Sequence, residues 1–290
     1  MTIKPGIYPD MSFDEYLAAD ALSMSAIATL IDSFPARLLH QKPPTRPMAI
    51  GRIMHAVQLE ARDFAELGYV VVPSGFSAAH TKKNAAERPE IVAALDAGMQ
   101  PLREADAESI RGMHAALRAD ERAQQAFSNG RPEVSVFWSD ERTGLLCKAR
   151  FDWLPDKGAI LPDLKTCESL DDAKLSRAVV TYKIAHRSYW YEQAARSIGI
   201  VDPIYAPVWI EKTPPHFCAI RPVSRFYVDA VRFEVEKMVA RYAHCREFGV
   251  WPGPSHFDEI EPPAWETKRL EYEYGADPAI RAQEPMEDAA

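Results

Sequence analysis

The hydrophobic pattern of this chain changes from helical to alternating at about residue 130, and this change limits the folds it can adopt. Residues 78–128 are polar and rich in Ala, Glu and Arg, as in surface helices. Residues 133–138 and 145–154 alternate apolar and polar side chains, and the turn-rich segment SDERTG joins them. Such a pair predicts a β-hairpin.

Further elements are expected on both sides of this hairpin. Before it, Asp14 and Glu15 indicate one short helix, Ser23 caps another, and residues 49–62 have helical spacing. After it, we expect strands at 158–165, 204–211 and 216–223 and helices at 181–198 and 226–248. The sequence thus predicts an α/β (mixed α+β) core, in which helices flank a central mixed sheet, with an N-terminal helical cap.

Composition excludes several classes of protein. The chain has 290 residues, 47% hydrophobic and 26% charged, which excludes a wholly disordered or collagen-like chain. With 34 Lys and Arg against 42 Asp and Glu, the net charge of −8 argues against nonspecific coating of nucleic acid but permits one locally basic channel. No apolar run could span a bilayer and no signal peptide is evident, so we expect a cytoplasmic protein without membrane contact. The cysteines are dispersed and predict neither a disulfide framework nor a zinc ribbon.

The domain organisation follows from charge and proline content. We expect residues 1–257 to form one domain, of which 1–128 is the mostly helical part and 129–257 the core that carries the strands. Residues 258–290 are rich in Glu, Asp and Pro, so we expect an acidic, partly disordered tail.

Charged side chains occupy one face of two consecutive predicted strands. Alternation places Lys148, Arg150 and Asp152 on one face of the second hairpin strand. Asp163 and Lys165 share a face of the following strand. A charged strand face is most often exposed to solvent, but a carboxylate and an amine at the end of a strand that looks buried need another explanation.

Phosphodiester hydrolysis is one such explanation. Two carboxylates on neighbouring strands can bind Mg²⁺, which prefers oxygen ligands. The bound metal acidifies a water molecule and neutralises charge on the phosphate, and a nearby lysine stabilises the transition state. Asp152, Asp163 and Lys165 have this arrangement. The short pattern alone is common by chance, so its placement on consecutive strands carries the prediction.

Four separated segments resemble one family of nucleases. The run GLLCKARFDWLPDKGAILPDLKTCESL resembles the catalytic core of PD-(D/E)XK nucleases, which have a restriction-endonuclease-like fold. The upstream GRIMHAVQLE, the downstream YWYEQA and the N-terminal GIYPDMSFDEYLAADALSMSAIATLIDSFPARL are similar to the phage and prophage exonuclease VIII (RecE-type) branch of the RecB-like group. The similarity extends from about Gly6 to Trp251, and the middle helical region matches poorly.

The resemblance implies a role for each matched residue. The implied catalytic residues are Asp152, Asp163, Lys165, His55 and Gln193. The implied metal ligands are Asp152, Asp163, the backbone carbonyl of Leu164, His55 and Glu133. A lone helical histidine such as His55 more often belongs to a core or a surface, and Glu133 has an equally good interpretation as a solvated edge-strand residue.

Contacts with DNA are less distinct in the sequence. The candidates are Lys148, Arg150, Tyr189 and Tyr191, and further phosphate contacts could come from Lys174, Arg177, Lys183 and Arg187. Tyr182, His186, Tyr189 and Gln193 line one helix face, where aromatic rings could stack on unpaired bases but more often fill a core. The family often has Tyr where this chain has Ser197, and Tyr-His where it has Tyr16-Leu17.

The resemblance implies a Mg²⁺-dependent exodeoxyribonuclease, in which Mn²⁺ would substitute. Such enzymes, from phages or their bacterial hosts, degrade linear duplex DNA from 5′ ends, supply 3′ strands to an annealing recombinase and often form homo-oligomeric rings. One alternative is a nuclease of the same fold that acts on single strands or flaps. Another is a degenerate DNA-binding module, although the Asp, Asp and Lys are intact. Residues 78–128 could form a clamp over DNA, a subunit interface or a structural cap.

Overall fold

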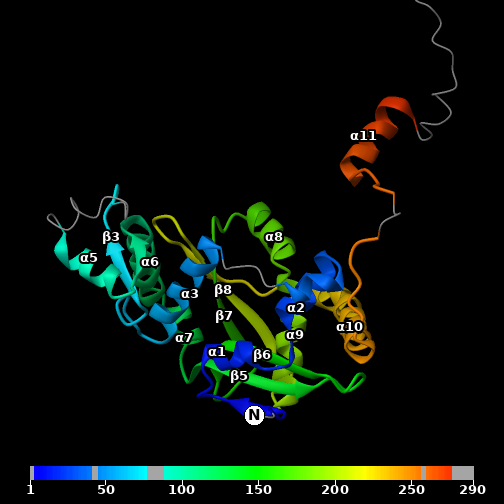
Figure 1. The fold of residues 1–290 in the computed structure, drawn as a ribbon, viewed down its shortest axis with the longest axis horizontal. Coiled ribbons are helices and arrows are strands. Elements are labelled where there is room, and N and C mark those ends of the chain that lie inside the picture. The colour runs from blue at the N-terminus through cyan, green and yellow to red at the C-terminus, as the bar shows by residue number, and fades with distance from the viewer. Residues whose placement is uncertain (1–2, 41–44, 77–87, 256–258, 276–290) are drawn as a thin grey trace, which may run out of the picture. The chain divides into compact units, whose positions relative to one another are not determined.

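The computed structural model describes residues 3–40, 45–76, 88–255 and 259–275. The chain separates into two compact units, Met1–Pro252 and Gly253–Ala290. Helices and strands alternate through the first unit (Figure 1). The second unit contains helix α11 (Ala264–Tyr274), which lies in the segment expected to be an acidic tail, and residues 276–290 of that segment are outside the described residues.

A long antiparallel hairpin organises the larger sheet of the first unit. Strands β5 (Gly130–Ser139) and β6 (Leu146–Pro155) confirm the expected hairpin. Their register places apolar partners opposite one another, namely Val134 and Phe151, Val136 and Ala149, and Trp138 and Cys147. All six side chains are buried, so this face of the hairpin packs into the core.

Two short strands extend this sheet. Strand β1 (Gly6–Tyr8) pairs with β5, and β2 (Leu22–Ser23) pairs with β6, which gives the order β1-β5-β6-β2. Strand β2 pairs with β6 only at Cys147 and Lys148, near the beginning of β6. The two short strands were not expected, because runs of two or three residues are too short to show alternation.

The second main sheet has the order β7-β8-β9. Strand β7 (Ile160–Cys167) pairs in parallel with β8 (Ile204–Glu211), and β9 (Cys218–Ile220) pairs antiparallel with β8. Parallel strands need a crossover connection, and helices α8 (Asp172–Thr181) and α9 (Ile184–Ser197) provide it. Strand β9 is shorter than expected and ends before Pro222, whose nitrogen cannot donate to a ladder.

A group of helices covers one face of β7 and β8. Helix α3 (Arg46–Leu59) begins earlier than expected because Pro47 fits the first turn of a helix. With α6 (Glu104–Ala119) and α7 (Glu121–Ala126), it forms a core. Its buried members include Ile53, Met54, Ile110, Met113, Leu117, Leu164 and Val208.

The region expected to be wholly helical also contains a strand. Strand β4 (Gln100–Arg103) pairs in parallel with β3 (Tyr69–Val72), and helix α5 (Pro89–Asp96) lies between them in sequence. The prediction of helix throughout 78–128 was therefore wrong at β4, where tertiary pairing outweighs the helical composition. Residues 77–87 lie outside the described residues.

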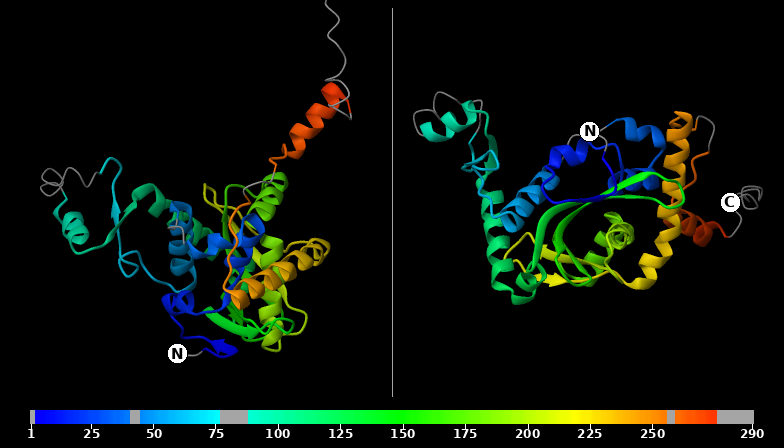
Figure 2. Two further views of the ribbon diagram at one scale, coloured as in Figure 1. Left: turned by 45° about the vertical axis from the view of Figure 1, so that its right-hand side comes forward. Right: turned by 90° about the horizontal axis from the view of Figure 1, so that it is seen from below.

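The second N-terminal helix, the β5–β6 hairpin and the two long C-terminal helices form a second core. Helix α1 (Phe13–Ala18) begins with a capping box of Ser12 and Glu15. Helix α2 (Met24–Asp32), capped by Ser23, is followed by the short helix η1 (Pro35–Leu39). Helix α9 packs against β6, β8 and helix α10 (Arg225–Phe248), as Figure 2 shows. No helix in the described part of the chain is both long and apolar enough to cross a bilayer.

Candidate metal and phosphate site

The expected carboxylates lie where the two main sheets meet. Strand β6 runs beside β7, and Oδ2 of Asp152 accepts a hydrogen bond of 2.7 Å from the backbone N–H of Leu164. Asp152 therefore joins the end of β6 to the middle of β7. This bond fixes its carboxylate next to the strand that carries the other expected catalytic residues.

Asp163 and Lys165 form an ion pair on β7. Asp163 is only 4% exposed, and its Oδ2 lies against the Lys165 ammonium. Residues two positions apart on a strand share a face, which explains why these side chains meet. Lys165 Nζ also donates to the carbonyl of Leu164 at 3.3 Å. Apart from this ion pair, Oδ2 of Asp163 has no hydrogen-bond partner among the described residues.

His55 connects α3 to both strands. Its Nε2 lies 2.8 Å from the carbonyl oxygen of Leu164, and its Nδ1 lies 3.5 Å from Oδ1 of Asp152. Burial alone would lower the pKa of His55, but the Asp152 carboxylate and its hydrogen bond raise that pKa to about 8. The structure thus places His55 in direct contact with the carboxylate centre.

Glu133 faces Asp152 across the hairpin. The flanking pairs of the ladder place these two residues opposite each other. Glu133 has a φ of 56°, a left-handed conformation that is uncommon for a non-glycine residue within a strand. Its Oε2 accepts a hydrogen bond of 2.8 Å from Nε of Arg150. Ligand atoms of His55, Glu133 and Asp152 all lie within 4.8 Å of one another, so this cluster can hold a metal ion.

The acidic groups of this centre perturb one another. Burial by itself would raise the pKa of Asp152, but the His55 ring, the Lys165 ammonium and a backbone N–H lower it to about 2. Burial and the negative charge of Asp152 raise the pKa of Asp163. The same two causes raise the pKa of Glu133. A bound cation would favour the ionised form of all three carboxyl groups.

The chemistry of these donors fits a divalent cation. Carboxylate oxygens are the ligands that hard divalent ions prefer, and imidazole suits several of the same ions. The Asp163 oxygen without a hydrogen-bond partner can supply one ligand, and the cluster of His55, Glu133 and Asp152 can supply others. The Leu164 carbonyl, the remaining expected ligand, accepts from both His55 and Lys165 in this arrangement.

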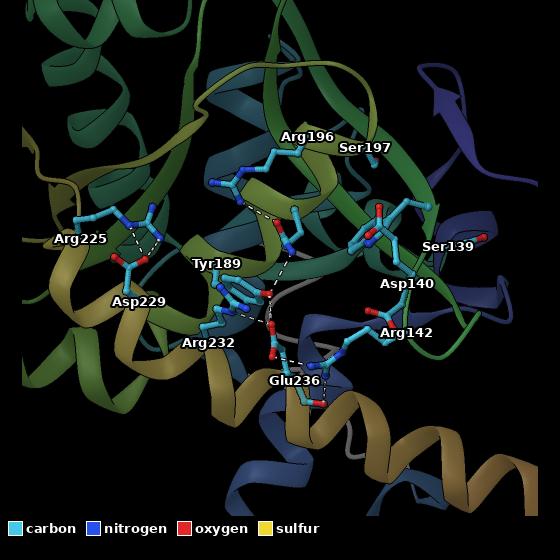
Figure 3. Close-up of a pocket in the computed structure, with 13 residues that line it drawn as sticks. Ser139, Asp140, Arg142, Tyr189, Arg196, Ser197, Arg225, Asp229, Arg232 and Glu236 are labelled. Carbon is cyan, nitrogen blue, oxygen red and sulfur yellow. Dashed lines mark hydrogen bonds and ion pairs between the residues drawn. The ribbon is translucent and has the colours of Figure 1, made fainter.

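Gln193 and Tyr189 lie in a different pocket. Gln193 Nε2 donates to the Tyr189 hydroxyl at 3.1 Å, and that hydroxyl donates to Oε1 of Glu236 at 2.9 Å. Arg142 and Arg232 also bind Glu236, so these side chains converge on one carboxylate (Figure 3). The pocket, of about 590 Å³, lies between the β5–β6 turn, α9 and α10. Because its hydrogen bonds hold Gln193 there, the structure does not bring Gln193 to the carboxylate centre.

Two further expected DNA contacts are engaged inside the protein. Lys148 is 6% exposed, and its Nζ donates to three backbone carbonyls around α1, those of Tyr16, Leu17 and Ala19. Nη1 of Arg150 donates to the Met11 carbonyl and the Ser135 hydroxyl, in addition to its bond with Glu133. The charged face of β6 is therefore buried beneath the N-terminal segment.

Tyr191 belongs to the wall of the carboxylate centre. Its hydroxyl donates to the carbonyl of Arg150 at 3.0 Å, and its ring packs edge-on against Phe151 with centroids 5.3 Å apart. The Tyr191 ring also contacts the ring of Tyr205 on β8. Burial raises the pKa of both tyrosine hydroxyls well above its usual range, and the negative charge of Asp163 adds to this effect.

Arg187 is the residue near this centre that the sequence did not distinguish. It was one of several basic residues with no preference among them, and Lys174 and Lys183 instead pair with Asp171 and Asp32. One signal could have distinguished Arg187 from the other basic residues. Arg187 and Tyr191 are one helical turn apart, which places both on one helix face.

Comparison with known proteins shows similarity to a domain family and to a solved structure. Residues 33–260 match a family described as "PDDEXK-like domain of unknown function (DUF3799)". The fold is similar to a crystal structure from Eubacterium rectale that is described as a "Putative exonuclease", with a TM-score of 0.61 and 14% sequence identity. That similarity covers 92% of this chain and 99% of the other, and at this identity it shows a common fold. Comparison with curated proteins gives no match.

Proposed function

This chain belongs to the family of PDDEXK-like domains, and from that premise we propose that it is a metal-dependent nuclease that hydrolyses phosphodiester bonds of DNA. The observation that carries the proposal is the single charged centre formed by Asp152, Asp163 and Lys165 at the junction of β6 and β7. A structural ion pair alone would not need a second carboxylate, that of Asp152, which is only 12% exposed and whose negative charge repels that of the first.

The residues of this centre have complementary tasks in the proposal. Asp152 and Asp163, with His55 and Glu133, would hold a divalent cation, which when bound supplies an acidified water and neutralises phosphate charge. The Lys165 ammonium has three protons, of which two are directed to Asp163 and the Leu164 carbonyl, so the third can hold an attacking water or a phosphate oxygen. Arg150 holds the Glu133 carboxylate in place through its Nε.

We also propose the finer properties that the sequence resemblance implies. The cation is Mg²⁺, for which Mn²⁺ substitutes, and the substrate is the end of linear duplex DNA. Cleavage proceeds from 5′ to 3′, as in the exonuclease VIII (RecE-type) branch, and leaves 3′ strands for an annealing recombinase. A cytoplasmic location and a ring-shaped homo-oligomer belong to the same proposal. The support for these properties is the order of four matched segments in the sequence.

A comparison of DNA forms tests this function. Linear duplex labelled at either end, closed circular duplex and single strands are each incubated with Mg²⁺ or with a chelator. We expect degradation of the linear duplex alone, from its 5′ ends and only with the metal. Cutting of the closed circle would indicate an endonuclease, and degradation of single strands alone would indicate the single-strand alternative. Digestion in chelator, or no digestion of any form, contradicts the proposed function.

A further inference from the structure

Arg187 on α9 is a half-buried cation without an acceptor among the described residues. Among the described residues, its guanidinium has neither a hydrogen bond nor an ion pair. The other cations of this region all have partners, since Lys165 pairs with Asp163, Arg150 with Glu133, and Lys148 with backbone carbonyls. The guanidinium is half-buried and the protein uses none of its five donors, so they are free to bind an anionic ligand.

Arg187 faces the carboxylate centre. Arg187 and Tyr191 are one helical turn apart and therefore lie on the same face of α9. The Tyr191 ring on that face packs against Phe151 of β6 and Tyr205 of β8. Burial by itself would lower the pKa of Arg187, but the Tyr191 and Tyr205 side chains and, to a smaller extent, the Asp163 and Asp152 carboxylates together raise it.

A second polar group near this centre also lacks a partner. Tyr205 is 2% exposed, and its hydroxyl has no hydrogen-bond partner in the part of the chain that the structure describes. Tyr205 is opposite Leu161 in the β7–β8 register, so its side chain shares the sheet face of Asp163. Buried polar atoms rarely lack a hydrogen bond, and the Tyr205 hydroxyl is such an atom near an arginine whose side-chain donors the described residues leave unused.

Charge balance points to the class of the missing ligand. Three carboxylates of the centre, Asp152, Asp163 and Glu133, are offset by the three cations Lys165, Arg150 and Arg187. A divalent cation would leave this group with an excess positive charge of about two, which suits a phosphate that gains negative charge during hydrolysis. A planar guanidinium binds phosphate oxygens in pairs, as an ammonium cannot.

We propose that Arg187 binds a non-bridging oxygen of the scissile phosphate, with the Tyr205 ring and hydroxyl forming the wall behind it. This inference rests on the proposed nuclease function. It separates Arg187 from the basic residues whose donors are used within the protein, and it assigns the Arg187 face of α9, rather than the Tyr189 and Gln193 face, to the substrate.

Binding to a duplex with one neutral linkage tests the inference. A methylphosphonate replaces the terminal internucleotide linkage at the 5′ end or, in a second duplex, at the 3′ end. Fluorescence anisotropy gives the Kd of each duplex with Ca²⁺ in place of Mg²⁺, and the DNA is checked afterwards for cleavage. The proteins are the wild type, Arg187→Ala, Arg187→Lys and the control Arg241→Ala, which removes an exposed arginine of α10.

We expect Arg187→Ala to weaken binding of the all-phosphate duplex by about tenfold to a hundredfold. For one of the two methylphosphonate duplexes, Arg187→Ala should weaken binding far less. In that duplex the neutral linkage is the one that Arg187 contacts, so its charge is already lost. Arg187→Lys should restore part of the loss, and Arg241→Ala should bind every duplex as the wild type does. Calorimetric titration with Ca²⁺ alone should give the same metal affinity for the Arg187 variants and the wild type.

Three results would overturn the assignment. One is an equal loss on all three duplexes, another is wild-type binding by Arg187→Ala, and the third is a loss confined to Ca²⁺ affinity, which would make Arg187 only a counter-charge for the carboxylates. Thermal melting checks that each variant is folded, and Arg187→Lys carries the test if Arg187→Ala does not fold. If the wild type cleaves DNA with metal but the effect of Arg187→Ala does not depend on the neutral linkage, only this inference is overturned. If the wild type does not cleave DNA, the proposed function is overturned as well.

Discussion

The carboxylate of Asp152 is bound to the backbone N–H of Leu164, one residue from each member of the Asp163–Lys165 ion pair. This hydrogen bond sets the position of the end of β6 relative to the middle of β7, although no continuous backbone ladder joins the two strands. Because backbone hydrogen bonds do not fix the two strands to each other here, side chains from both strands can bind the same ligand. The geometry leads to predictions that separate metal binding, chemistry and stability.

Asp152→Asn should abolish cleavage through loss of metal binding. The amide keeps an oxygen that can accept from Leu164 N–H but removes the negative charge, so folding should persist. We expect metal affinity and activity to fall by more than about 100-fold, since even mutation of groups that only support a ligand costs about 10- to 100-fold. Calorimetry with Mn²⁺ and initial cleavage rates measure the two effects. The control is Asp171→Asn, which removes an exposed carboxylate, and unchanged Mn²⁺ affinity in Asp152→Asn contradicts the assignment.

Lys165→Met should separate chemistry from DNA binding. The substitution keeps the aliphatic stem but removes the ammonium that contacts Asp163 and the Leu164 carbonyl. We expect the cleavage rate at saturating DNA to fall by about 100- to 1,000-fold, the usual effect of removing one preorganised donor. The Kd for duplex DNA in Ca²⁺ should change little by comparison. Single-turnover kinetics check this, and a rate within threefold of wild type would remove Lys165 from the mechanism.

The pKa of His55 predicts a pH dependence of metal affinity. In the metal-free protein this pKa is about 8, and a protonated imidazole cannot bind a metal. Metal affinity should therefore rise about tenfold per pH unit below 8 and level off above it. His55→Gln should bind metal more weakly and lose this slope. Mn²⁺ titrations from pH 6 to 9 measure it, and a slope that is equal in wild type and His55→Gln would show that another group is responsible.

The same pKa predicts how the stability of the metal-free protein changes with pH. The folded-state value of about 8 lies above the ordinary value of 6.5, so protonated His55 stabilises the fold. That contribution, about 2 kcal/mol at most, is fully present below pH 6.5 and is lost as the pH rises through 8. Urea unfolding in chelator at pH 6 and pH 9 should show the loss in wild type but not in His55→Gln. The opposite sign would mean that His55 is neutral in the fold.

The sequence predicted those parts of the fold that local pattern controls. The β5–β6 hairpin, β7, β8 and α10 show their period over many residues, so they could be predicted. Strands β1 and β2 are too short to show a period. Strand β4 gains its partner from β3 across the chain, which local composition cannot reveal.

The site divides in the same way. Asp152, Asp163 and Lys165 could be selected because their positions on strands fix which face they share. The sequence could not show which face of α9 is directed to the site, because this depends on what packs against each face. Tyr189 and Gln193 bind partners on α9 and α10, whereas Tyr191 packs against Phe151 of β6, and Arg187 lies one helical turn before Tyr191. Lys148 is buried because α1 folds over it, a contact between residues 129 or more positions apart.

Two helical glycines should respond in opposite ways to substitution by alanine. A Cβ on Gly112 of α6 would collide with the His216 ring, whereas a Cβ on Gly51 of α3 would meet no other group. The His216 ring cannot move aside easily, because it is 8% exposed and its Nδ1 lies 2.9 Å from the carbonyl oxygen of Glu211. Gly112→Ala should therefore destabilise the protein by about 1–3 kcal/mol.

Gly51→Ala should instead stabilise it by about 0.5–1 kcal/mol, the ordinary effect of removing backbone freedom from a helix interior. Chemical denaturation of both variants measures the difference, and the shared substitution cancels the intrinsic preference of alanine for helix. If Gly112→Ala were as stable as Gly51→Ala, the close packing of α6 against the β8–β9 loop would be wrong. That outcome would also weaken the placement of α6 over the sheet that carries Asp163.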